Sequence, residues 1–235
     1  MKSYKLIVFL SLLLTVTSCK KIINIQETDL IAGPVALKTV TNNEQAIIGA
    51  YAALGVEMNI LLNATLSDEV ATAGEFYNAA TTHEWQYAST DVGIRDNFMA
   101  IYTNYTIIDR ANRVLAAVGT ADSTKAGDNV KRNLLKGEAL FLRAYAHFEL
   151  FRYYCGNYTT TGLAMPYMET PDIKPQARIK LDVYFQKLNA DIAAAKALLP
   201  NNLVDINRAT VAAANALHAR SEERRVGKEC TSVCR

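Results

Sequence analysis

Residues 129–154 are apolar on almost every side of the helix that their spacing predicts. One stripe at helical spacing comprises Leu135, Ala139, Leu142, Ala146, Leu150 and Tyr153. A second stripe beside it comprises Phe141, Tyr145 and Phe148. The remaining polar edge, which we expect to face solvent, comprises Arg132, Lys136, Arg143 and His147. A helix with so little polar surface must be covered on several sides, so we expect it to lie inside a stack of helices.

Further segments repeat apolar residues at the same spacing, and they predict helices over 42–54, 95–118, 181–199 and 207–220. Asn42 and Asn43, followed by Glu44, are typical of a helix start, and Gly55 of a helix end. No long segment alternates apolar and polar residues as a strand does. We therefore predict an all-α fold of tetratricopeptide-like stacked helical hairpins with long irregular loops.

Small residues recur in the predicted helices at positions where neighbouring helices could approach closely. They are Gly49, Gly137, Ala139 and Ala213. Two segments between the helices are irregular, at about 59–93 and 156–178. The first contains the only tryptophan, Trp85, and mixes aromatic rings with neutral polar groups.

The N-terminus is typical of an exported lipoprotein. Lys2 and Lys5 precede a short apolar run, and small residues then lead to Cys19, so residues 1–18 are a predicted signal peptide. The apolar run is shorter than the roughly 18 residues of a membrane-spanning helix. We expect Cys19 to carry lipid and residues 19–41 to form an extended tether. The alternative is an ordinary secretion signal with an incidental cysteine.

Composition indicates the class of protein, and the C-terminal sequence indicates where the helical domain ends. Half of the 235 residues are hydrophobic, and the net charge is only +2, which indicates a folded protein without a nucleic-acid partner. The helical domain is expected to span 42–220. Residues 221–235 read as an atypical, charged tail, which we interpret as foreign sequence where the natural protein would continue.

Motifs for nucleotide binding, serine hydrolysis and zinc binding are missing from the sequence. We therefore expect no cofactor, no metal site and no catalytic residues. The histidines stand alone, and Cys230 and Cys234 read as incidental. Two acids can hydrolyse a glycosidic bond, and Asp68, Glu69 and Asp91 keep a carbohydrate-active enzyme as a remote alternative.

Several ordered blocks of the chain resemble the SusD/RagB family of outer-membrane lipoproteins of Bacteroidetes. The strongest block runs from Gly137-Glu138-Ala139 through Phe141-Leu142-Arg143-Ala144-Tyr145 and continues into Gly162-Leu163 with Pro166. Other matching blocks are Gly49-Ala50-Tyr51, Ala111-Asn112 and Leu198-Leu199-Pro200. Family members are about twice as long, so the chain corresponds to their N-terminal part.

The resemblance implies a SusD-like α-α superhelix and a non-catalytic function. Such a protein is lipid-anchored at the outer membrane, exposed at the cell surface, and captures an oligosaccharide or other nutrient for a TonB-dependent, SusC-like transporter. Candidate glycan-binding residues are Trp85, Tyr77, Tyr87 and Asn78. Two alternatives remain: these rings simply pack the loop onto the helices, or the helical repeats are a scaffold that binds only proteins.

Overall fold

The computed structural model describes residues 33–55, 60, 62–67, 69–70, 80–88, 90–92, 100–172, 174–202 and 205–226. The chain divides into two units, Met1–Ala36 and Leu37–Arg235. In the first unit the described residues form the short helix α2 (Gly33–Ala36). The predicted signal peptide and Cys19 lie outside the described residues.

The second unit is mainly helical. Its long helices are α3 (Val40–Ala52), α7 (Ala100–Ala117), α8 (Asp128–Tyr154), α9 (Leu181–Lys196) and α10 (Val211–Val226). Two single turns, α4 (Asn63–Leu66) and α5 (Ala80–His83), precede α7. Strands β1 (Leu163–Ala164) and β2 (Ile179–Lys180) form a short antiparallel ladder that pairs Leu163 with Lys180 and Ala164 with Ile179. The predicted all-α class is confirmed.

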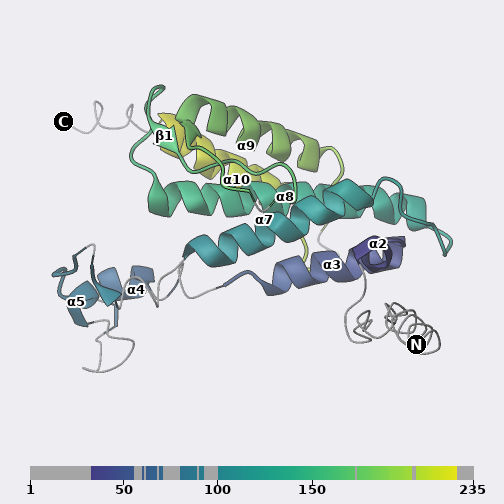
Figure 1. Ribbon diagram of the computed structural model, residues 1–235, viewed down its shortest axis with the longest axis horizontal. Helices are drawn as coiled ribbons and strands as arrows, with labels where there is room; N and C mark the ends of the chain where they lie inside the picture. Colours follow the sequence, from purple (N-terminus) through teal and green to yellow (C-terminus); the bar gives the residue numbers. More distant parts are fainter. Residues whose placement is uncertain are drawn as a thin grey trace, which may run out of the picture. The chain divides into compact units, whose positions relative to one another are not determined.

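Helix α8 is the centre of the stack. It contacts α3 and α7 on one side and α9 and α10 on the other (Figure 1). One buried cluster fills the space between α8, α3 and α7, and includes Ile47, Ile108 and Leu142. A second fills the space between α8, α9 and α10, and includes Phe148 and Leu188. Burial on both sides explains why the sequence of α8 is apolar in two stripes.

Arg143 and His147 do not face solvent as the sequence led us to expect. Both are buried, and His147 has no exposed surface. The predicted polar edge of α8 is wrong at these two positions because α9 and the segment after β1 cover it. Glu138, which is also fully buried, accepts two hydrogen bonds from Arg208 at 2.8 and 2.6 Å. This pair ties α8 to the residues just before α10.

Helix α3 begins earlier than the asparagines suggested. Thr39 is its N-cap residue, and the Thr39 hydroxyl accepts a hydrogen bond from the Asn42 backbone N–H at 3.1 Å. Asn43 is instead buried inside the helix, where its side chain donates to the carbonyls of Leu37 and Thr39. The helix ends at Ala52, before Gly55. A threonine hydroxyl therefore supplies the cap that the amides were expected to supply.

Helix α10 continues beyond the predicted end near residue 220. It reaches Val226, Ser221 is buried, and Glu222 accepts a hydrogen bond from Asn189 of α9 at 2.9 Å. The expected end of the helix is therefore wrong by six residues. The interpretation of 221–235 as foreign sequence stays a prediction. The helix starts at Val211 and not near residue 207, because residues 205–210 form the turn that carries Arg208.

Close helix approach is confirmed at Gly137 but not at Gly49. A Cβ atom added to Gly137 would lie 2.9 Å from the Leu198 Cβ and 3.3 Å from the backbone of Leu198 and Leu199. A Cβ atom on Gly49 would meet nothing within 4 Å. Only a glycine allows the segment after α9 to pass this close to α8.

We predict opposite effects of alanine at these two glycines. Gly137→Ala should lower the free energy of unfolding by about 1–3 kcal/mol, because backbone atoms must shift to make room. Gly49→Ala should raise it by about 0.5–1 kcal/mol, because alanine loses less backbone entropy in a helix. Urea titrations of both variants would measure the difference, and equal effects would contradict the close contact.

Candidate functional site

The turn after α5 holds Trp85 in an unusual backbone conformation. Trp85 has a φ angle of 59°, the left-handed region that glycine normally occupies. The Trp85 N–H donates to the Thr82 carbonyl at 3.2 Å, and the Gln86 N–H donates to the Thr81 carbonyl at 2.8 Å. This pair of bonds is the Schellman motif that closes a helix C-terminus, with tryptophan at the position that usually carries glycine.

The Trp85 side chain projects into solvent. Its exposed fraction is 64%, and Tyr87 two residues later is 45% exposed. The left-handed conformation costs a residue with a Cβ about 1–2 kcal/mol. A bulky aromatic residue in such a conformation, with its ring exposed, is a candidate for a functional role. The assignment of Trp85 as a glycan-binding residue stays a prediction.

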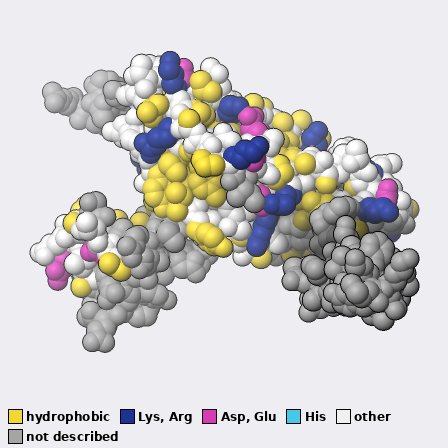
Figure 2. Space-filling view, in the orientation of Figure 1, with side chains coloured by type: hydrophobic (Ala, Val, Ile, Leu, Met, Phe, Trp, Pro, Cys, Tyr) yellow, Lys and Arg dark blue, Asp and Glu magenta, His cyan; other side chains and the backbone are white. Residues whose placement is uncertain are grey.

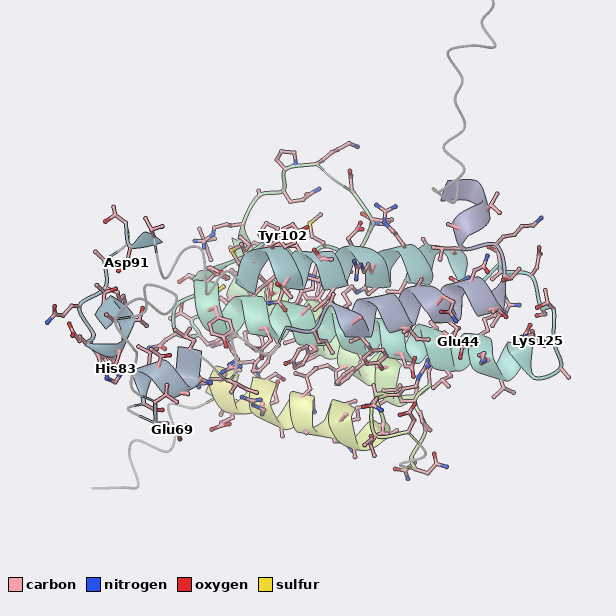
Figure 3. The ribbon with its side chains drawn as sticks, turned by 90° about the horizontal axis from the view of Figure 1, so that it is seen from below. Glu44, Glu69, His83, Asp91, Tyr102 and Lys125 are labelled. Atoms are coloured by element: carbon pink, nitrogen blue, oxygen red, sulfur yellow. The ribbon has the colours of Figure 1, made fainter. Side chains whose placement is uncertain are left out.

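Neighbouring polar contacts fix this turn. The Thr81 hydroxyl bonds to the Asp91 carboxylate at 2.5 Å, which closes the loop that carries Trp85 and Tyr87. His83 forms a hydrogen bond of 3.3 Å with the carbonyl of Thr65, so α5 is tied to α4 (Figure 3). Asp91 therefore has a structural partner in the loop. Of the other predicted residues, Tyr77, Asn78 and Asp68 lie outside the described residues.

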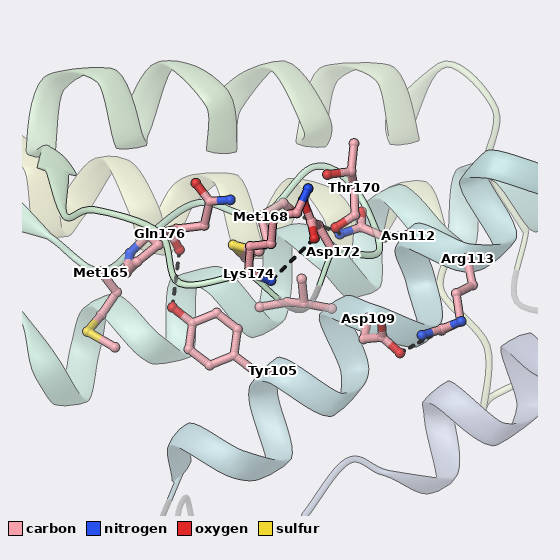
Figure 4. A pocket seen from close by; sticks show the side chains of 12 residues that line it. Tyr105, Asp109, Asn112, Arg113, Met165, Met168, Thr170, Asp172, Lys174 and Gln176 are labelled. Atoms are coloured by element: carbon pink, nitrogen blue, oxygen red, sulfur yellow. Dashed lines mark hydrogen bonds and ion pairs between the residues drawn. The ribbon is translucent and has the colours of Figure 1, made fainter.

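A groove between α7 and the segment after β1 is a second feature, one that the sequence did not reveal. Its volume is about 520 Å³. Its lining residues are Tyr105, Ile108, Asp109, Asn112, Arg113, Met165, Pro166, Met168, Thr170, Asp172, Lys174 and Gln176 (Figure 4). The first five lie on one face of α7 at helical spacing, and the others belong to the predicted irregular segment 156–178.

Side chains from the helices hold the backbone of this segment in place. The Tyr105 hydroxyl donates to the Pro166 carbonyl at 3.2 Å, and the Asn112 amide donates to the carbonyls of Met168 and Thr170 at 3.0 and 3.3 Å. Burial is the main reason that the pKa of Tyr105 rises to about 12, so the phenol remains a donor at neutral pH. The wall of the groove is therefore rigid although it contains little regular secondary structure.

A buried polar network lies beneath the groove. Arg143 donates to both carboxylate oxygens of Asp191 at 2.7 and 2.5 Å, to the Asn112 side-chain oxygen at 2.9 Å and to the Glu169 carbonyl at 3.2 Å. Burial acts to lower the pKa of Arg143, but the hydrogen bond and charge of Asp191 outweigh it and raise the pKa. Tyr167 also donates to Asp191, at 2.6 Å.

His147 belongs to the same network as a neutral base. Its Nε2 accepts a hydrogen bond from the Met168 N–H at 3.2 Å, and its ring stacks on Tyr167 with 3.8 Å between centroids. Complete burial, with the nearby Arg143 charge adding to it, lowers the pKa of His147 to about 3. The imidazole is therefore uncharged at neutral pH and serves the packing of the Met168 segment.

Neither a metal centre nor a membrane span is found in the part of the chain that the structure describes. No group of three or more histidine, cysteine or acidic side chains there is placed to hold a metal ion. None of the described helices is both long and apolar enough to cross a bilayer. Cys155, half-buried at the end of α8, is a free thiol.

The fold and these surfaces define a helical-repeat protein with exposed aromatic residues. A family model described as SusD-like, starch-binding associating with outer membrane, matches residues 29–221. The chain belongs to this SusD-like family. No protein of curated function matches it.

Solved structures share the fold at low sequence identity. A SusD superfamily protein from Bacteroides vulgatus superposes with a TM-score of 0.65 at 19% identity, over 81% of this chain and 44% of that one. One from Bacteroides thetaiotaomicron gives 0.63 at 18%, over 80% and 43%. Surface glycan-binding protein A from Bacteroides fluxus gives 0.55 at 24%, over 77% and 39%. The chain thus spans less than half the length of these structures.

We predict that His147 makes the folded state less stable at acid pH. The pKa of histidine is about 6.5 in the unfolded chain, so between pH 6.5 and about 3 the unfolded state binds the extra proton. Stability should therefore fall as the pH falls through this window, by up to about 1.4 kcal/mol per pH unit.

The measurement is the free energy of unfolding at several pH values between 7 and 4.5 for the natural chain and for His147→Gln. In this variant the free energy of unfolding should depend much less on pH. His218→Gln, in α10, is the matched control and should keep the pH dependence of the natural chain. Identical slopes for His147→Gln and the natural chain would contradict a buried neutral His147.

Proposed function

We propose that the chain is part of an outer-membrane lipoprotein that captures glycans or other nutrients and delivers them to a TonB-dependent transporter. It acts by binding, without catalysis. Family membership supports the outer-membrane association and the carbohydrate ligand. The single observation that carries the binding site is the exposed Trp85 ring, held on a closed turn in a left-handed backbone conformation.

The chemistry of sugars fits such a ring. One face of a pyranose presents C–H groups, which pack on the flat indole, while its hydroxyls need hydrogen-bonding partners. Trp85 and Tyr87 are the proposed platforms, and Tyr77 and Asn78 are proposed as a further ring and a polar partner. Because the Thr81–Asp91 bond and the Schellman turn already fix the loop, little conformational entropy is lost on binding.

Cys19 is proposed to carry the lipid that anchors the chain to the cell outer membrane at the surface. The transporter is proposed to receive the nutrient after capture. A helical-repeat scaffold that binds only proteins is the alternative, and it predicts no affinity for any oligosaccharide.

We predict that two substitutions of Trp85 separate binding from folding. Trp85→Ala and Trp85→Gly should both weaken binding of the cognate oligosaccharide at least about tenfold, because each removes the indole. Trp85→Gly should be about 1 kcal/mol more stable than Trp85→Ala, because glycine adopts the left-handed conformation without strain. Calorimetry with a panel of soluble oligosaccharides that includes maltoheptaose measures the first effect, and urea titration measures the second.

Tyr102→Ala is the matched control. Tyr102 is an aromatic residue with 74% of its surface exposed (Figure 3), but it belongs to α7 and not to the turn that carries Trp85, so its removal should leave oligosaccharide binding unchanged. Unchanged affinity in both Trp85 variants would refute Trp85 as the platform. If no oligosaccharide binds the natural chain, the result would favour the scaffold.

A further inference from the structure

The groove beside α7 has the size of a binding site and a rigid wall. A volume of about 520 Å³ lies within the usual range of ligand pockets, roughly 300–1,000 Å³. The bonds from Tyr105 and Asn112 to the carbonyls of Pro166, Met168 and Thr170 fix the Met165–Thr170 backbone. A partner that enters the groove therefore meets a preformed surface, which lowers the entropy cost of binding.

The floor of the groove suits apolar side chains. Ile108, Met165, Pro166 and Met168 line it, and the two thioether side chains are flexible enough to adapt to differently shaped partners. Figure 2 shows hydrophobic side chains gathered on this face, with basic and acidic side chains close by. These four side chains offer no strong hydrogen-bonding partner to a sugar hydroxyl, so an apolar ligand group fits against them better.

The charges at the rim are largely compensated within the chain. Arg113 bonds to Asp109 at 2.7 Å, and Lys174 pairs with Asp172 at 3.5 Å (Figure 4). These two pairs contribute no net charge. A ligand therefore gains little from them beyond hydrogen bonds.

Arg178 lies next to the groove through its contact with Met165, and its charge is not compensated in the same way. It is exposed, and its guanidinium donates to the Tyr154 carbonyl at 3.3 Å and to the Met165 sulfur at 3.7 Å. No carboxylate of the described residues pairs with it. The contact with Met165 places this uncompensated positive charge beside the apolar floor, where it would attract a carboxylate.

We propose that the groove is a docking site for an extended segment of a partner protein that carries an apolar side chain close to an aspartate or glutamate. The apolar side chain occupies the floor between Ile108, Met165 and Met168. The acidic side chain binds the Arg178 guanidinium. The occupant and the residues differ from those of the glycan site at Trp85, so this docking site does not depend on the proposed glycan binding.

The probe is a random heptapeptide library displayed on phage and selected on the full chain. Selected peptides should combine apolar residues with an acidic residue. Their synthetic versions should lose affinity about tenfold on Met168→Ala, which removes apolar contact area, and about three- to tenfold on Arg178→Gln. Selection on Arg178→Glu should shift the preference from acidic to basic residues. Fluorescence anisotropy measures the affinities.

Lys136→Glu is the matched charge control, because Lys136 is an exposed residue of α8 that does not line the groove. It should leave both affinity and selected sequences unchanged. Circular dichroism must show equal helicity for all variants. The proposal is overturned if no sequence class is enriched or if the acidic preference survives Arg178→Glu. It is also overturned if oligosaccharides displace the peptides from the natural chain but not from the Trp85 variants, because the peptides would then bind at Trp85.

Discussion

The Arg143 guanidinium is buried and bonds to groups on three different elements of the fold. It reaches Asp191 on α9, Asn112 on α7 and the Glu169 carbonyl of the segment after β1. A charge in such a place costs several kcal/mol unless it is paired and hydrogen-bonded on all sides. The helices on the two sides of α8 must therefore keep one relative position, since any shift would leave this charge unpaired. Apolar packing has no preferred direction, so we infer that this network helps to select the observed arrangement.

The network also explains how an irregular segment becomes a surface that can bind. Arg143 and His147 of α8 form hydrogen bonds with the backbone of residues 169 and 168. Tyr105 and Asn112 of α7 form hydrogen bonds with the carbonyls of Pro166 and Met168 in the same segment. The groove is then rigid without a sheet or helix of its own. The turn at Trp85 follows the same principle on a smaller scale, because backbone hydrogen bonds and the Thr81–Asp91 bond maintain a conformation that tryptophan would otherwise avoid. In both places hydrogen bonds fix the backbone beneath an exposed surface.

The helices could be predicted from the sequence because apolar spacing reports which faces are buried. The spacing could not reveal that Arg143 and His147 are buried, since their partners Asp191 and Tyr167 lie 48 and 20 residues further along the chain and no local pattern joins them. Trp85 could be selected from the sequence by its residue type. Its left-handed backbone could not, because a glycine is the usual sign of such a turn and this turn has a tryptophan in its place. The groove was missed for a similar reason. It arises only where α7 meets a loop about 60 residues later.

The measurement that tests this account most directly is a double-mutant cycle between Arg143 and Asp191. Arg143→Met, Asp191→Asn and the double variant would be compared with the natural chain by urea unfolding. If the buried pair fixes the stack, Arg143→Met alone should cost about 3–5 kcal/mol, and the coupling energy should be at least about 2 kcal/mol. A coupling energy below about 0.5 kcal/mol would show that apolar packing holds the helices and the loop without the network, and would contradict the account.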